Sequence, residues 1–443
     1  MSMKIPRPIQ IVIDHLNKNG YEAYLVGGCV RDALLQKDCH DYDITTNARP
    51  SQIQALFTTT IPTGIAHGTV TIVIEEMMVE VTTYRTESEY KDHRHPDQVQ
   101  FVNSLQEDLA RRDFTINAMA YHPKEGLIDF FHGQEDLAQK KIRCVGNPET
   151  RFEEDALRML RAHRFAAQLG FTIEKQTLKT INDHPEWITY VASERIVKEL
   201  SKIMRYDPYE IENMTEMMSY FMPELKQAKA CEQNSPWHDA TVLHHTLRAL
   251  RLMTPFDETV AFALLFHDLG KMSTKTTVDG RDHFYHHQVE SAKLAKTYCE
   301  KLKLSNLQKK QIIDLVACHD DSLSANLKNV YRYRIELGFD DSFMKLLMEV
   351  KRCDILAHSP LGQKTIQKWK DFDQFYQKCI QERPLCLKDL CITGKDILEW
   401  TSLQGALIQK ALNACLQLCF YSPNMNQRAH LQLFVKRNQK EWN

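Results

Sequence analysis

The sequence has no apolar stretch long enough to cross a membrane. Its longest apolar run is VAFALLF at residues 260–266, whereas a spanning helix needs about 20 such residues. The first residues, MSMKIPRPIQIVIDHL, also lack the apolar segment of a secretion signal. We therefore expect a cytoplasmic protein that has no contact with a membrane.

Cysteine pairs with the spacing of a metal or disulfide motif are also absent. The 12 cysteines are scattered from Cys29 to Cys419, and none forms a Cys-x-x-Cys pair. This pattern excludes a zinc ribbon and argues against a disulfide framework. It is typical of reduced thiols that pack as small apolar groups inside an intracellular protein.

An excess of charge of one sign is missing as well. The formal net charge is -2 at pH 7, which excludes a uniformly basic nucleic-acid coat but not a local basic groove. Internal repeats and low-complexity tracts are absent, and the 43% hydrophobic and 26% charged fractions are those of an ordinary globular protein.

The 443 residues are enough for two to four domains at the usual size of about 100 to 200 residues each. Up to about residue 145, β-rich stretches such as YEAYLVGG and GTVTIVIEEMMVEVTTYR alternate with helical patterns. Beyond that point, helical periodicity continues to the end. The sequence therefore predicts an α+β fold, with a mixed-sheet head followed by helical parts. The expected parts are a head at 1–147, a neck at 148–205, a body at 206–365 and a tail at 366–443.

A glycine turn is followed closely by two carboxylates. The stretch YLVGGCVRDALL predicts a strand, a turn and the start of a helix, where a phosphate can approach the backbone N–H groups. About ten residues later, HDYDITT places Asp41 and Asp43 two residues apart, so on a strand both side chains point to the same face. Such a pair suits two Mg²⁺ ions that clamp a triphosphate and an attacking hydroxyl. An isolated Asp-x-Asp is more often a solvated strand edge, and the glycine turn favours the metal site here.

A third carboxylate is available on the next β-rich stretch. Glu80 lies between valines in MVEVTTYR. It is either a further ligand of the metal or an outward-facing strand residue, and the sequence leaves both open.

The stretch FEEDALRMLRAHRFAAQLGF at residues 152–171 predicts one amphipathic helix. Asp155, Arg158, Arg161 and Arg164 follow one polar flank of it. Cytosine and adenine both present an amino donor beside a ring-nitrogen acceptor, which a carboxylate and a guanidinium meet together. A fixed Asp155 and Arg158 would therefore accept C or A and reject U or G without a template. The alternative is a simple salt bridge within the helix.

Together these motifs resemble the class II nucleotidyltransferases, the family of CCA-adding enzymes and bacterial poly(A) polymerases. The resemblance rests on Gly27-Gly28-x-Val-Arg31-Asp32, Asp41-x-Asp43, DLARRDFTINAMAY and EEDALRMLRAHRFA, and covers the first 170 residues. It continues more loosely to the end of the chain.

The resemblance implies a polymerase-β-like head and a set of site residues. Gly28 and Arg31 are expected on the nucleoside triphosphate, Asp41 and Asp43 on Mg²⁺, and Arg112 on the incoming nucleotide. Without the resemblance, the Arg-Arg-Asp around Arg112 reads as a surface ion-pair cluster.

The resemblance also assigns the residues that select the base. It gives base selection to Asp155 and Arg158 and further nucleotide contacts to Arg161 and Arg164. The polar segment at residues 83–101, TYRTESEYKDHRHPDQVQF, resembles the family's flexible loop. Its presence favours an enzyme that adds all of CCA, and the alternative is an ordinary surface loop.

Nine of the 19 histidines lie between His238 and His358. The stretches TVLHHTLRAL, LLFHDLGK and RCDILAH carry the pattern of HD-domain phosphohydrolases, with further histidines in FYHHQVESA and LVACHDD. The expected ligands of a second divalent metal are His245, His267, Asp268, His287, His319 and Asp354. These ligand types suit Mg²⁺, Mn²⁺, Ni²⁺ or Fe alike. The body is then either a phosphohydrolase or a helical scaffold.

The sequence therefore predicts a template-independent enzyme that adds CCA to the 3′ end of tRNA from CTP and ATP and releases pyrophosphate. Its partners are tRNA and the two nucleotides, and no feature indicates a protein partner. The alternatives are a poly(A) polymerase or A-adding enzyme, and an HD phosphohydrolase whose head only binds nucleotide. A catalytically inactive RNA-binding scaffold is disfavoured, because a binding groove for a polyanion has no need of clustered carboxylates.

Overall fold

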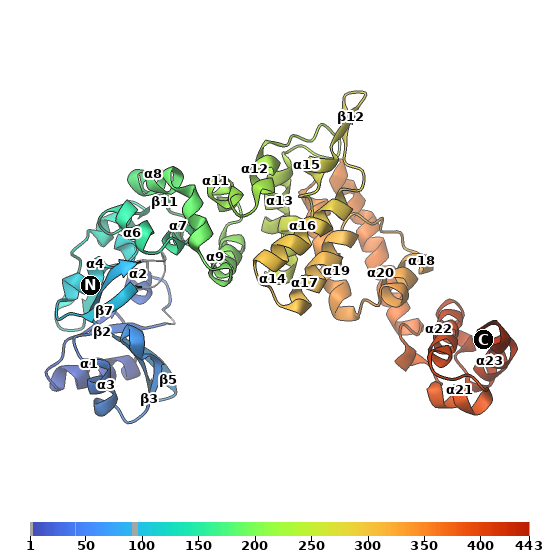
Figure 1. Cartoon of the computed structure of the whole chain (residues 1–443), viewed down its shortest axis with the longest axis horizontal. Helices are drawn as coiled ribbons and strands as arrows, with labels where there is room; N and C mark the ends of the chain where they lie inside the picture. Colours follow the sequence, from blue (N-terminus) through green and yellow to red (C-terminus); the bar gives the residue numbers. More distant parts are fainter. Residues whose placement is uncertain (1–2, 40, 91–95, 443) are drawn as a thin grey trace. The chain divides into compact units, whose positions relative to one another are not determined.

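The computed structural model describes residues 3–39, 41–90 and 96–442 (Figure 1). The chain divides into two compact units, the first formed by residues 1–227 with 301–303 and the second by residues 228–300 with 304–443. In the described ranges, no helix combines the length and the apolar character that a membrane crossing requires.

The first unit begins with a mixed seven-stranded sheet in the order β3-β4-β5-β2-β1-β8-β9. The pair β2–β5 is parallel, and the other neighbours are antiparallel. The α+β prediction is therefore confirmed. The strands are β1 (Ala23–Val26), β2 (Asp43–Thr46), β3 (Thr60–Gly64), β4 (Thr69–Ile74), β5 (Met77–Thr83), β8 (Ala120–His122) and β9 (Gly126–Ile128).

Helix α1 (Arg7–Lys18) shows how the core of the head is built. Its buried residues are Ile9, Val12, Ile13 and Leu16, and this i, i+3, i+4, i+7 spacing forms one apolar stripe. The strands bury alternate residues, such as Val79 and Val81 of β5. The other head helices are α2 (Gly28–Leu34), α3 (Pro50–Leu56), α4 (Leu105–Ala110) and α5 (Gly133–Ala138).

The prediction of one continuous helix over residues 152–171 is wrong. Helix α6 (Pro148–Glu154) ends before Asp155, and α7 (Leu157–Leu169) begins two residues later. Asp155 has an extended backbone, and its carboxylate accepts a hydrogen bond from the backbone N–H of Leu157 at 3.1 Å. A short acidic side chain that binds a nearby N–H competes with helix continuation, which explains the break.

The predicted loop at residues 83–101 is largely a β-hairpin. Strand β6 (Arg85–Tyr90) pairs antiparallel with β7 (Pro96–Phe101), and residues 91–95 lie outside the described residues. The expectation of weak structure is therefore wrong for the two strands. Pairing between adjacent segments supplies backbone hydrogen bonds that a search for apolar periodicity does not detect.

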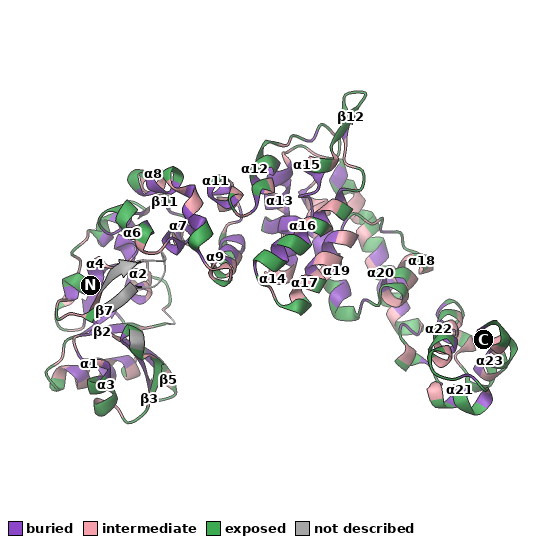
Figure 2. Cartoon of the chain, viewed as in Figure 1, coloured by how far each residue is buried: buried purple, intermediate pink, exposed green. Residues whose placement is uncertain are grey.

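The remaining elements of the first unit are mostly helical. Its helices carry both buried and exposed residues (Figure 2). The remaining elements are β10 (Lys141–Ile142), β11 (Thr172–Ile173), α8 (Lys175–Asp183), α9 (Ser193–Tyr206), α10 (Glu210–Asn213), α11 (Thr215–Ser219) and α12 (Pro223–Ala230), whose last residues belong to the second unit.

Helix α14 (Glu258–Phe266) is the centre of the second unit. Its residues from Val260 to Phe266 are all buried, as expected for a helix that is apolar on every side. It contacts α13 (Val242–Arg251), α17 (Asn306–Cys318) and α19 (Asp341–Ala357). The other elements of this body are α15 (Lys271–Thr274), β12 (Thr276–Val278), β13 (Arg281–His283), α16 (His287–Lys301), α18 (Leu327–Tyr331) and α20 (Ile366–Glu382).

The last residues have a core of their own within the second unit. Helices α21 (Gly394–Trp400), α22 (Ala406–Tyr421) and α23 (Arg428–Trp442) enclose Cys415, Cys419, Leu431 and Val435. All 12 cysteines are free thiols and most are buried, so the prediction of reduced thiols that serve as packing groups is confirmed.

Candidate functional site

The glycine turn of the head lies against two of the predicted site residues. Strand β1 leads into Gly27, which has a positive φ of 76° and precedes α2. A Cβ atom on Gly27 would lie 3.2 Å from Nη1 of Arg112 and 3.7 Å from Oδ2 of Asp43. Only glycine meets both the conformation and the close approach. The turn, the guanidinium and the carboxylate are therefore neighbours.

Seven of the nine residues predicted for the head site line one cavity of about 600 Å³. Asp41 and Asp43 both face it, although β2 begins only at Asp43 and Asp41 precedes the strand. The cavity is also lined by residues that were not predicted from the sequence, namely Asp113, Asn117, Phe165 and Tyr206. The seven predicted residues are Gly28, Arg31, Asp41, Asp43, Arg112, Arg161 and Arg164.

The carboxylates of the head are crowded. The register of β2 against β5 places Glu80 beside Asp43. The pKa of Asp43 is raised, chiefly by desolvation and further by Glu80 and Asp41, against the opposing effect of Arg112. Clustered carboxylate oxygens are the ligands that Mg²⁺ prefers, and a divalent cation would relieve their repulsion. The donor set therefore fits Mg²⁺, while Glu80 is exposed and is not among the residues that line the cavity.

Carboxylates hold the arginines of this cavity in place. Arg161 donates to Asp113 from Nε at 2.7 Å, and Arg164 donates to Glu199 at 2.9 Å. Burial raises the pKa of Asp113, but Arg161 outweighs this effect and the pKa is about 2. Since ion pairs at fixed positions lose little entropy when a ligand arrives, these guanidiniums are prepared for an anion.

Three of the arginines also surround one aromatic ring. The guanidinium carbon of Arg164 lies 3.5 Å from the centre of the Phe165 ring, and those of Arg31 and Arg161 lie at 5.2 and 5.4 Å. Arg31 donates to Asn117 at 2.8 Å. The ring attracts the cations and separates them, which keeps several positive charges around one cavity.

The predicted base-selecting pair is not among the residues that line the cavity. Asp155 accepts two hydrogen bonds from Arg195, at 3.0 and 2.7 Å. Arg158 is 8% exposed and donates to Glu154 at 2.6 Å and to the backbone oxygen of Arg111 at 2.9 Å. In this structure the two side chains therefore bind other partners. No sequence pattern pointed to Arg195, because it lies 40 residues from Asp155.

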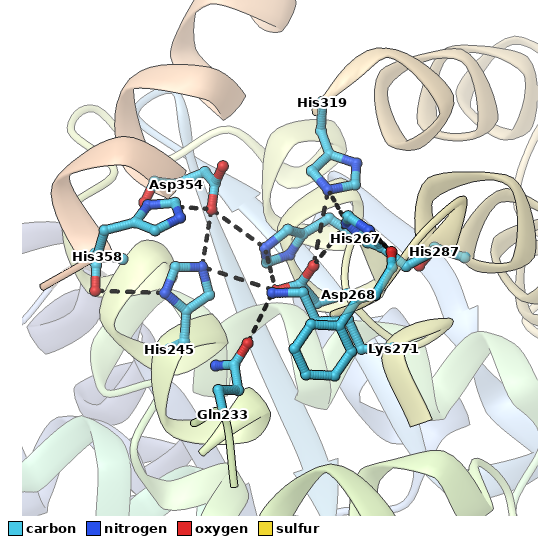
Figure 3. A network of polar contacts seen from close by, with 12 residues as sticks. Gln233, His245, His267, Asp268, Lys271, His287, His319, Asp354 and His358 are labelled. Atoms are coloured by element: carbon cyan, nitrogen blue, oxygen red, sulfur yellow. Dashed lines mark hydrogen bonds and ion pairs between the residues drawn. The ribbon is translucent and has the colours of Figure 1, made fainter. Parts of the chain in front are cut away.

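The six residues predicted for the body come together in one cluster (Figure 3). Nε2 of His245 lies 2.8 Å from Oδ1 of Asp354, and Nε2 of His267 lies 3.2 Å from Oδ2 of Asp268. Asp268 Oδ1 also lies 3.4 Å from His287 and 3.7 Å from His319. Asp268 is thus central, with histidines on both sides.

The histidine rings are oriented by backbone carbonyls. Nδ1 of His267, His287 and His319 lies 2.6 to 2.9 Å from the oxygens of Leu264, Phe284 and Val316. These contacts turn each Nε2 toward the cluster, as in histidines that bind metals. Nε2 of His267 is buried without a hydrogen-bond partner.

The charges of the cluster also fit a cation. Burial lowers the pKa of His245 to about 4, so its imidazole is neutral and able to ligate. Burial also acts to lower the pKa of His267, but Asp268 and Asp354 outweigh it and the pKa is about 10. A divalent cation would replace that proton as the partner of the two carboxylates. The arrangement is consistent with a metal site.

Two further histidines adjoin the predicted ligands. His238 and His358 form a group with His245 in which the possible ligand atoms lie within 4.8 Å of one another. The rings of His238 and His358 are 4.6 Å apart, and Nδ1 of His238 is buried without a hydrogen-bond partner. Both residues bound the histidine-rich range of the sequence, but neither was predicted as a member of the cluster.

Comparisons with known proteins match three parts of the chain to known families. Family models match at residues 23–143 (poly A polymerase head domain), 170–229 (probable RNA and SrmB-binding site of polymerase A) and 240–374 (HD domain). The CCA-adding enzyme of Staphylococcus saprophyticus is 35% identical over 433 residues, which cover 96% of both chains. This chain belongs to the CCA-adding enzyme family.

Other CCA-adding enzymes are more similar over a shorter range. The enzyme of Oceanobacillus iheyensis is 54% identical over 194 residues, 44% of this chain and 48% of the relative. That of Limosilactobacillus reuteri is 52% identical over 197 residues, 44% of this chain and 49% of the relative. The chain thus spans about half the length of these CCA-adding enzymes in the alignments.

Solved CCA-adding enzymes have the same fold. The crystal structure of the Bacillus stearothermophilus enzyme in complex with CTP matches with a TM-score of 0.72 at 25% identity, over 99% of both chains. The Thermotoga maritima enzyme complexed with tRNA matches with a TM-score of 0.57 at 19% identity, over 97% of this chain and 94% of that one. The predicted family and fold are therefore confirmed.

Proposed function

We propose that this chain adds CCA to the 3′ end of tRNA from CTP and ATP and releases pyrophosphate. The observation that carries the proposal is the cavity where the Gly27 turn, the carboxylates of Asp41 and Asp43, and the guanidinium of Arg112 meet. We also propose that it acts in the cytoplasm, where tRNA, CTP and ATP are available. The structures of relatives named for complexes with CTP, ATP and tRNA support the choice of substrates.

The arrangement suits an in-line displacement at the α-phosphate. Asp41 and Asp43 would hold Mg²⁺, which when bound stabilises the charge that develops on the attacking and leaving oxygens. Arg31 and Arg112 bind the triphosphate beside the N-terminus of α2. Arg161 and Arg164 hold the nucleotide, and their carboxylate partners fix their orientation. The terminal ribose hydroxyl of tRNA then displaces pyrophosphate.

Base selection falls to Asp155 and Arg158 in this proposal. Both must exchange their present partners for the edge of C or A, Asp155 by leaving Arg195 and Arg158 by leaving Glu154 and the Arg111 carbonyl. A wrong base leaves buried polar groups without partners, which rejects U and G. The segment at residues 83–101, of which β6 and β7 are described, is the proposed movable element for the change from C to A.

We also propose that the histidine cluster binds a divalent metal and hydrolyses phosphate esters. Its six predicted ligands are two carboxylates and four imidazoles around Asp268, a set that suits several divalent ions. We further propose that the chain is divided into a head, a neck, a body and a tail, with boundaries after residues 147, 205 and 365.

The length of the product tests the first proposal. Purified full-length protein is incubated with tRNA that ends at its discriminator base, and the products are sized. CTP alone should add two nucleotides, and CTP with ATP should add three. Addition of A in the absence of CTP, with no use of CTP, would favour the poly(A) polymerase alternative instead.

A further inference from the structure

Two cavities adjoin at the histidine cluster. One has a volume of about 490 Å³ and the other about 230 Å³. His319, Asp354 and His358 of the cluster line both of them. A phosphate held by the metal ligands therefore has space for a substituent in two directions. A phosphate monoester would leave one of the two cavities unused.

The larger cavity has a basic and aromatic wall. Lys271, Arg281 and His283 line it together with Tyr285, which is 67% exposed. The rings of His283 and Tyr285 are stacked, with centres 5.3 Å apart and planes at 5°. Flat rings and cations in one wall suit a base and its phosphate.

This wall is fixed to the rest of the body. The β12–β13 hairpin, which carries Arg281 and His283, is tied to the segment before α13. The backbone N–H of Asn234 donates to the carboxylate of Asp282 at 2.8 Å, and Lys275 pairs with the same carboxylate at 2.8 Å. The aromatic surface is therefore present before a ligand arrives.

The smaller cavity has an apolar and aromatic side and a polar side. Trp237, Trp369, Leu323 and Ile355 form the first. The polar side includes Asp320, Asp321, Lys351 and Lys368. Trp237 is 47% exposed and also lines the larger cavity. The indole N–H of Trp369 donates to the oxygen of Met348 at 2.8 Å, which fixes that ring. Its volume is below the about 300 Å³ of the smallest drug-sized pockets, which suits a single nucleobase.

We propose that the phosphate ester cut at the histidine cluster joins two nucleotide units, as at an end of single-stranded RNA. This inference rests on the proposed phosphohydrolase function and names its substrate class. One nucleoside lies against Trp237 and Trp369, and the other lies against the Arg281–Tyr285 wall. Water attacks the phosphorus, and the bond from phosphorus to one ribose oxygen breaks. That oxygen takes the proton that water loses, and the other nucleotide keeps the phosphate.

Hydrolysis of three small probes by the full-length protein, supplied with Mn²⁺, tests the proposal. The probes are adenylyl-(3′→5′)-adenosine, 2′,3′-cyclic AMP and p-nitrophenyl phosphate. We expect kcat/KM for the dinucleotide to exceed that for cyclic AMP by about tenfold or more, because one stacked base contributes about 1 to 3 kcal/mol. An equal or higher kcat/KM for cyclic AMP would overturn the proposal.

Trp237→Ala sharpens the test. It should raise KM for the dinucleotide about tenfold, equivalent to about 1.4 kcal/mol, and change kcat less than about twofold. Trp237→Phe should restore KM, and bound metal should stay constant in both variants. Tyr285→Ala, at an exposed position, should raise KM by a smaller factor. An unchanged KM in both alanine variants would contradict the proposed binding walls.

The same assay separates this inference from the function on which it rests. One outcome is that Asp354→Ala loses hydrolysis of p-nitrophenyl phosphate while the wild type shows no preference for the dinucleotide. That result overturns the proposed substrate class and leaves the phosphohydrolase function in place. The absence of hydrolysis of all three probes overturns both.

Discussion

The head cavity and the histidine cluster hold their candidate ligands in different ways. Asp43 begins strand β2 and Asp41 lies two residues before it. Both face the head cavity and offer only oxygen atoms. The histidine cluster is largely buried and offers mainly imidazole nitrogens. An all-oxygen carboxylate pair suits Mg²⁺ that arrives with nucleotide phosphates, whereas a largely buried, nitrogen-rich set suits an ion that stays bound.

The two sites also differ in how the chain builds them. The head carboxylates are two residues apart, whereas His245 reaches Asp354 across 109 residues. Helix α14 connects these distant parts, since its buried apolar face positions His267 and Asp268 at its end. Damage to one site should therefore leave the other intact, because they share no residues.

The largest expected effect is the loss of nucleotide addition in Asp43→Ala. Removal of this carboxylate leaves the metal with incomplete ligands, so the rate should fall by about a thousandfold or more. Extension of labelled tRNA lacking CCA measures the rate with CTP and ATP. Near-normal extension would contradict the assignment of Asp43.

Asp354→Ala should remove the second activity in the same way. The variant should lose hydrolysis of p-nitrophenyl phosphate and at least part of its bound metal, because Asp354 contacts both His245 and His267. Metal analysis after dialysis and a colorimetric assay give the two readouts. Full hydrolysis with an unchanged metal content would contradict the assignment of Asp354 to the metal site.

Arg112→Ala should slow addition of both nucleotides by about a hundredfold, since a half-buried donor to a developing phosphate charge is lost. The matched control is Arg7→Ala, at a largely exposed side chain that makes a long 3.8 Å ion pair with Glu75. Steady-state kinetics with CTP and with ATP provide the comparison. A loss confined to one nucleotide would show that Arg112 reads the base.

Asp155→Ala should weaken base selection more than catalysis. Without its carboxylate, discrimination of CTP against UTP should fall by about tenfold to a hundredfold. Competition between the two nucleotides on tRNA lacking CCA measures this ratio. Unchanged discrimination would leave Asp155 as a structural partner of Arg195 alone.

The smallest effect concerns stability. The pKa of Asp113 is lowered from 3.8 to about 2, so its ionised form stabilises the fold above pH 3.8 and this contribution is lost as the pH falls through about 2. Asp113→Asn should therefore lower the free energy of unfolding by about 2 kcal/mol near neutral pH. Denaturant unfolding should show this difference shrinking below pH 3.8, and a difference independent of pH would argue against the pair with Arg161.

The sequence predicted the residues that are close along the chain better than those that meet in space. The Gly27 turn and the Asp41 and Asp43 pair follow from local rules for strands and turns, and both line the expected cavity. The break at Asp155 was missed because apolar periodicity continues through this residue, whereas the helix is interrupted there. Arg195 was missed because its ion pair with Asp155 depends on the packing of α9 against α7.

The histidine cluster was predicted for a different reason. Its six residues matched a known pattern, since local rules alone do not bring five segments together. His238 and His358 stand outside that pattern, and only the fold shows their rings beside His245. The hairpin formed by β6 and β7 was missed because its strands lack the apolar alternation that marks a strand in the core.

A crossed activity assay tests whether nucleotide addition and ester hydrolysis belong to two separate sites. Wild type, Asp43→Ala and Asp354→Ala are each given labelled tRNA lacking CCA, CTP, ATP and p-nitrophenyl phosphate in one tube. We expect that Asp43→Ala loses only tRNA extension and Asp354→Ala loses only ester hydrolysis. Loss of tRNA extension in Asp354→Ala with full extension in Asp43→Ala would contradict the assignment of the two activities to these sites.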